Sequence, residues 1–167
     1  MRKLALSLAF LLASIVINAQ ESKIITRVDD SGDVASFELD CSIKFPSLAK
    51  GLRYNITRHE FKGVEKKNTY RILFVMDGFF TTALNSKMTF SAVFVDGTMT
   101  SEEETVESDG YFSGACTLLL NSPPELGLKT DLKEIILNTG NKKVVYAITA
   151  QRAKEFRKNL QNIVDAK

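Results

Sequence analysis

The sequence has no tryptophan and only one histidine, His59, among its 167 residues. Catalytic zinc sites use three protein ligands, commonly histidines, and no HExxH segment occurs, so we expect no zinc enzyme. A Ser-His-Asp triad would have to use His59, whose neighbours Arg58 and Glu60 indicate an exposed, charged segment. GxSxG, P-loop and dinucleotide-binding motifs are missing as well. The sequence therefore predicts a non-catalytic protein that needs no cofactor or metal.

Cysteine is scarce too, with only Cys41 and Cys116 in the chain. They form no CxxC pair, and both fall on the apolar side of an expected strand. In an oxidising compartment they could meet across a core as a disulfide. The alternative is two buried free thiols, which pack as small apolar side chains. We favour the bridge, although the separation of the two residues in space decides the choice.

Only one long hydrophobic run is present, residues 4–17, and it is shorter than the roughly 20 residues of a membrane-spanning helix. Arg2 and Lys3 precede the run, and Ala19 follows it at a suitable cleavage position. This order is typical of a secretory signal peptide. We expect residues 1–19 to be a signal and residues 20–167 to form one exported domain. That domain would be periplasmic or extracellular and would have no stable membrane insertion after cleavage.

The chain has no large excess of one charge. Removal of residues 1–19 takes two basic residues from the 22 and leaves 20, against 20 acidic residues. Such a balance gives no net attraction to nucleic acid or to an anionic membrane. Positive charge does gather locally in residues 47–69, which predicts either a solvated loop or a contact surface for an anionic partner. The six residues of this possible basic surface are Lys50, Arg53, Arg58, Lys62, Lys66 and Lys67.

Alternation of apolar and polar residues is the strongest pattern present. The alternation is strict from Ala35 to Phe45, which predicts a strand with one buried and one solvent-exposed face. Such a strand is typical of an antiparallel sheet. Residues 87–95 alternate as well. Residues 70–76 are continuously apolar and are expected to be buried on both faces. The acidic segment 98–106 is expected to form an edge strand.

Residues 47–69 allow either a short helix, from the spacing of Leu48, Leu52 and Ile56, or a strand. Residues 132–149 can form a hairpin around Gly140-Asn141 or a capped helix over 132–139, and we favour the hairpin. Residues 150–165 predict an amphipathic helix. Its N-cap would be Thr149, and its apolar stripe comprises Ala153, Phe156, Leu160, Ile163 and Val164.

These patterns together predict a mainly β fold. We expect an antiparallel β-sandwich or small open barrel of about eight to nine strands, with one C-terminal amphipathic helix packed on it. The favoured function is an exported, non-catalytic binding or interaction protein whose partner is an unknown protein or glycan. The alternative is a small β-barrel that carries an apolar, lipid-like ligand, which the eleven phenylalanines motivate. A hydrolase that uses carboxylates alone is the least favoured reading.

Overall fold

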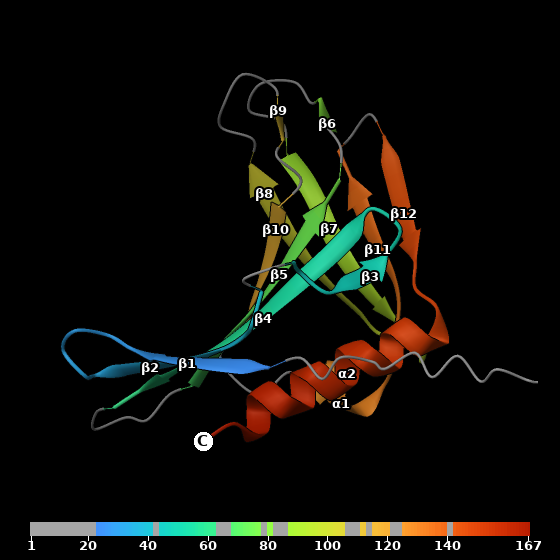
Figure 1. The fold of residues 1–167 in the computed structure, drawn as a ribbon. Coiled ribbons are helices and arrows are strands. Elements are labelled where there is room, and N and C mark those ends of the chain that lie inside the picture. The colour runs from blue at the N-terminus through green and yellow to red at the C-terminus, as the bar shows by residue number, and fades with distance from the viewer. Residues whose placement is uncertain are drawn as a thin grey trace, which may run out of the picture.

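The computed structural model describes residues 23–41, 44–62, 68–77, 80–81, 87–105, 111–112, 115–120, 125–139 and 142–167. The predicted signal, residues 1–19, and the Gly140-Asn141 turn lie outside these ranges. In the described part, twelve strands form two main antiparallel sheets and one small pair, and two helices accompany them (Figure 1). Nine of the strands have five or more residues. The predicted class, mainly antiparallel β with a C-terminal helix, is confirmed.

A six-stranded sheet has the order β1-β2-β4-β5-β10, with β3 pairing separately with β4. Its members are β1 (Ile24–Val28), β2 (Val34–Leu39), β3 (Ser47–Ala49), β4 (Leu52–Phe61), β5 (Asn68–Met76) and β10 (Ala115–Leu120). A four-stranded sheet has the order β12-β11-β7-β8. It contains β7 (Lys87–Phe94), β8 (Met99–Thr105), β11 (Leu132–Asn138) and β12 (Lys143–Ala147). The small pair is β6 (Phe80–Thr81) with β9 (Tyr111–Phe112).

Strand β2 follows the alternation of the sequence: Ala35, Phe37 and Leu39 are buried, and the residues between them are half-buried. The strand ends at Leu39, earlier than the predicted Phe45. The ambiguous segment 47–69 contains β3 and β4 rather than a helix. The helical spacing of its apolar residues misleads because positions four apart also share one face of a strand.

The C-terminal hairpin is confirmed, since β11 and β12 pair antiparallel with Ile135 opposite Tyr146. Strand β8 lies at a sheet edge, as its acidic sequence predicts. The prediction that 70–76 is buried on both faces is wrong, because Arg71 is exposed and buried positions alternate along β5. The face of β5 that carries Arg71 therefore points away from the core. Residues 80–81 pair with β9 rather than folding back on β5.

Helix α2 (Ala150–Asp165) begins at the predicted N-cap, where the Thr149 hydroxyl accepts a hydrogen bond from the backbone N–H of Arg152. Its buried residues are Ala153, Phe156, Asn159, Leu160 and Ile163. The short helix α1 (Glu125–Lys129) packs against α2. Gly127 permits this approach, because a Cβ there would lie 2.7 Å from a Leu160 methyl carbon.

Aromatic rings fill the space between the two sheets and α2. The ring centroids of Phe74 (β5) and Phe90 (β7) lie 5.1 Å apart. Phe156 of α2 lies 6.3 Å from Phe74 and 5.0 Å from Tyr54 of β4. The fold is therefore sandwich-like and not a closed barrel, with α2 running along the lower side of the sandwich in Figure 1. No helix of the described ranges is long and apolar enough to cross a membrane.

Candidate functional site

The predicted basic surface includes Arg58, and for this residue the prediction is wrong. Arg58 is only 4% exposed. It continues the buried, even-numbered face of β4, so its side chain points under α2 instead of into solvent. Its guanidinium nitrogens donate to the carbonyl oxygens of Val164 (2.5 Å) and Ala166 (2.6 Å), and its Cζ lies 4.1 Å from the centroid of the Phe37 ring. Arg58 therefore caps the C-terminus of α2.

Among the residues that the structure describes, the other basic residues do not gather into one patch. Arg53 forms an ion pair with Asp77, and Lys50 is exposed in the β3–β4 turn. Lys62 is exposed just beyond the far end of β4, which is ten residues long, or roughly 30 Å at about 3.3 Å per residue. Lys66 and Lys67 lie outside the described residues. The described members Lys50 and Arg53 thus lie at one end of β4 and Lys62 at the other.

The structure instead brings polar residues together on the outer face of the six-stranded sheet. Register places Ser36 of β2 opposite His59 of β4, with Arg27 and Thr69 directly opposite them on β1 and β5. Next to them, Glu38 of β2 lies opposite Thr57 of β4, and Thr57 lies opposite Arg71 of β5. We call these residues the outer-face cluster: Arg27, Ser36, Glu38, Thr57, His59, Thr69 and Arg71.

Two contacts organise the outer-face cluster. The Oγ of Ser36 lies 2.8 Å from the Nδ1 of His59, and the Nε of Arg27 donates to Glu38 at 2.8 Å. Arg71 is exposed and has no ion-pair partner among the described residues. The cluster thus offers one free guanidinium beside several hydroxyl groups and an imidazole. Such a set can hydrogen-bond a carboxylate or sulfate group.

The Ser36–His59 pair does not make a nucleophilic triad. A triad requires a carboxylate on the second ring nitrogen of the histidine and donors for an oxyanion. In the described part of the chain, no carboxylate hydrogen-bonds that nitrogen, and the pair lies on an open strand face. A cross-strand hydrogen bond accounts for it. The alternation of the sequence assigns Ser36 and His59 to solvent-exposed strand faces, but only the strand order shows that their side chains are in contact.

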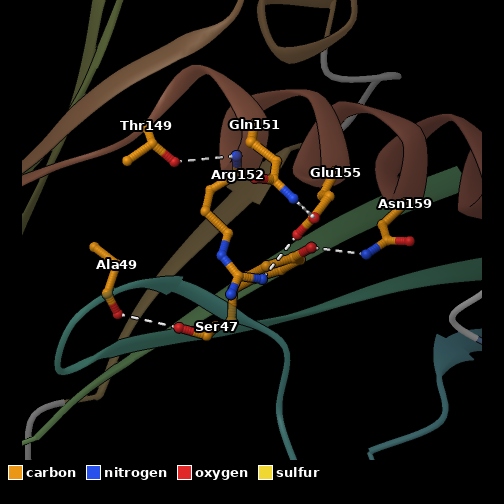
Figure 2. Close-up of polar contacts among 8 residues, drawn as sticks. Ser47, Ala49, Thr149, Gln151, Arg152, Glu155 and Asn159 are labelled. Atoms are coloured by element: carbon orange, nitrogen blue, oxygen red, sulfur yellow. Dashed lines mark hydrogen bonds and ion pairs between the residues drawn. The ribbon is translucent and has the colours of Figure 1, made fainter. Parts of the chain in front are cut away.

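A second polar group lies where α2 packs over the β3–β4 hairpin (Figure 2). Arg152 and Gln151 both bond Glu155 one turn along the helix. Asn159 donates to the hydroxyl of buried Tyr54 at 2.7 Å. Burial raises the pKa of Tyr54 to about 12, and the Asn159 hydrogen bond opposes this shift in part. The Asn159–Tyr54 hydrogen bond fixes α2 on β4, and the Glu155 contacts lie within the helix, so we assign all of them a structural role.

Cys41 is a free cysteine, while the side chain of Cys116 lies outside the described part. Strands β4 and β5 separate β2, which Cys41 follows, from β10, which contains Cys116. Three strand spacings amount to about 14 Å. A disulfide needs Cα atoms within about 7 Å. We therefore expect two free thiols rather than the predicted bridge.

Cys41 should react slowly with thiol reagents in the folded protein. Burial, together with the negative charges of Glu38 and Asp40, raises the pKa of Cys41 to about 11. Since the thiolate is the nucleophile, its reaction with iodoacetamide at pH 8 should be about 100-fold slower than in urea. Mass spectrometry of a Cys116→Ser variant measures both rates. Equal rates in the folded and unfolded states would contradict the expectation.

The described residues contain no group of three or more His, Cys, Asp or Glu side chains that could hold a metal ion. No family model, curated protein or solved structure matches the chain.

Proposed function

We propose that this chain is an exported, non-catalytic binding protein that contacts its partner through the outer-face cluster. The signal-like residues 1–19 motivate export. The observation that carries the proposal is the convergence of seven polar side chains from four strands on one solvent-facing sheet surface. Rigid strands hold binding groups in fixed positions, which lowers the entropy cost of binding.

The chemistry of the cluster favours a partner that carries carboxylate or sulfate groups, such as an acidic polysaccharide. Arg71 supplies an exposed guanidinium that is not engaged by a carboxylate of the described residues. Thr57 lies directly opposite it, and Thr69 lies two positions away on the same strand face. A guanidinium binds a carboxylate through two parallel hydrogen bonds, and neighbouring hydroxyls satisfy the remaining lone pairs.

The two other hypotheses, a carrier of an apolar ligand and a hydrolase that uses carboxylates alone, have less support. A carrier would hold its apolar ligand between the sheets, where the rings of Phe74, Phe90 and Phe156 already pack against one another. A carboxylate hydrolase needs two facing carboxyl groups. The outer-face cluster has one, Glu38, and it is paired with Arg27.

Binding of oligogalacturonate, with a neutral maltooligosaccharide as the ligand control, tests the proposal. We expect the purified protein to bind the acidic oligosaccharide only. Arg71→Ala should weaken this binding about tenfold or more, since a hydrogen bond to a charged group contributes about 1.5–3 kcal/mol. Arg152→Ala removes an exposed arginine from α2 and should leave binding unchanged. Isothermal titration calorimetry measures all three proteins.

Absence of binding to the acidic oligosaccharide would contradict an anionic glycan as the partner. Equal affinities for the wild-type protein and the Arg71→Ala variant would contradict the location of the site. Far-UV circular dichroism of both variants checks that neither substitution changes the fold.

A further inference from the structure

Strand β1 forms an edge of the six-stranded sheet, because it pairs only with β2 in the described part of the chain. The backbone N–H of Asp40 donates to the carbonyl of Lys23 (2.7 Å), and the N–H of Asp29 donates to the carbonyl of Val34 (3.0 Å). Antiparallel hydrogen bonds alternate, so odd-numbered residues of this strand bond β2. The N–H and C=O groups of the even-numbered residues 24, 26 and 28 therefore point to the open edge.

This edge lacks the charges that are present at both edges of the four-stranded sheet. Strand β8 contains three consecutive glutamates, and β12 begins with Lys143 directly after Lys142. The single charge of β1 is Arg27, whose guanidinium is held by Glu38 of the same sheet. The rest of β1 is two isoleucines, a threonine and a valine, and Val28 is 55% exposed. An unprotected, β-branched edge readily accepts another strand.

We propose that β1 pairs antiparallel with β1 of a second copy of this chain, with the two-fold axis passing through Thr26. The six-stranded sheets of the two copies then become one continuous sheet. In this register Ile24 lies opposite Val28 of the second copy. That contact covers the exposed valine at both ends of the pairing.

Charge complementarity selects this register. A two-fold axis normal to the sheet keeps each face on its own side, so residues directly opposite must share a face. With Thr26 at the centre, Lys23 lies opposite Asp29 of the second copy, and this ion pair occurs twice. A centre at Ile25 would instead place Lys23 opposite Arg27. A centre at Arg27 would place the two arginines against each other. Like charges directly opposite destabilise a strand pair.

The pairing also joins the outer faces of the two copies. Arg27 lies opposite Ile25 of the second copy, so the two outer-face clusters become one surface across the dimer axis. A partner with repeated binding groups could then contact both clusters and gain avidity. The dimer itself does not depend on the proposed function. Pairs of five-residue strands bury less than the roughly 1,200 Å² of a stable interface, so we expect a reversible dimer with a Kd of about 10 µM to 1 mM.

Sedimentation velocity from about 10 µM to about 1 mM tests the proposal, with Val28→Lys and Val145→Lys as matched variants. Both valines are exposed on edge strands, at 55% and 47%. We expect the wild-type protein and Val145→Lys to shift from monomer to dimer as concentration rises. Val28→Lys should stay monomeric, because the lysine would lie against Ile24 of the second copy. A monomeric wild type at about 1 mM, or a Val28→Lys variant that dimerises like Val145→Lys, would overturn the proposal.

Oxidative cross-linking tests the register. Two residues on the axis have Cα atoms about 5.5 Å apart, within reach of a disulfide. With copper phenanthroline, Thr26→Cys should form a covalent dimer on non-reducing gels at least tenfold faster than Thr98→Cys, whose exposed site lies in the β7–β8 turn. The wild-type chain measures the background from Cys41 and Cys116. Equal rates for the two variants would overturn the Thr26-centred register.

Discussion

Substitution of Phe74 by alanine should lower the free energy of unfolding by about 4 kcal/mol. Phe74 is 1% exposed and is the one described aromatic residue whose ring contacts both the opposite sheet, at Phe90, and α2, at Phe156. Removal of the ring takes away apolar area and leaves a cavity that neighbours from three elements cannot all move to fill. Since domains of this size unfold at about 5–15 kcal/mol, the substitution should remove a large share of the stability.

Urea denaturation followed by far-UV circular dichroism measures this effect, because a chain without tryptophan gives little intrinsic fluorescence change. Phe61→Ala is the matched control. Phe61 lies at the end of β4 and is 40% exposed, so its loss should cost about 0.5 kcal/mol or less. A cost below about 1 kcal/mol for Phe74→Ala would contradict the assignment of Phe74 to the centre of the core.

The second large effect concerns the buried arginine that caps α2. Arg58→Met should lower the free energy of unfolding by about 3 kcal/mol, because the carbonyls of Val164 and Ala166 lose their donors while they remain partly buried. Methionine keeps most of the apolar contact with Phe37, so the loss should reflect the hydrogen bonds rather than packing. Amide exchange should also increase in the last turn of α2, since that turn would open without global unfolding.

Arg152→Met is the control for this experiment. Arg152 has 46% of its side chain exposed and forms an i,i+3 pair with Glu155, so we expect a change of about 0.5 kcal/mol or less. Replacement of a buried charge by an apolar side chain can also stabilise a protein. An Arg58→Met variant as stable as the wild type would mean that desolvation of the guanidinium offsets its two hydrogen bonds, and our view of Arg58 as a cap would be wrong.

Arg58 shows why sequence alone assigned a buried residue to the predicted basic surface. Its neighbours in sequence are charged, which indicates exposure, but its position follows Tyr54 and Ile56 on the buried face of β4. Burial of a charge at that position requires partners. Glu60, two residues away, forms an ion pair at 3.6 Å, but both hydrogen-bond acceptors come from residues more than 100 positions away. The residues around Arg58 in the sequence do not indicate such distant acceptors, so an interpretation from local sequence places Arg58 on the surface.

The outer-face cluster was missed for a related reason. Alternation in β2 and β4 indicates which residues face solvent, including Ser36 and His59. Their contact depends on β2 pairing with β4 in one register, across 23 positions of sequence. A shift of two residues would keep every side chain on its face and yet bring different pairs together. Periodicity therefore predicts faces but not neighbours.

The sequence by itself determined the strands that alternate, the apolar face of each and the amphipathic helix α2, and it favoured the C-terminal hairpin over a helix. These features depend on local periodicity, because a strand repeats every two residues and a helix every 3.6. Only the tertiary structure decided the strand order, the sandwich in place of a closed barrel, the burial of Arg58 and the exposed edge of β1. Each of these depends on contacts between residues far apart in the chain, which the packing of the whole domain selects.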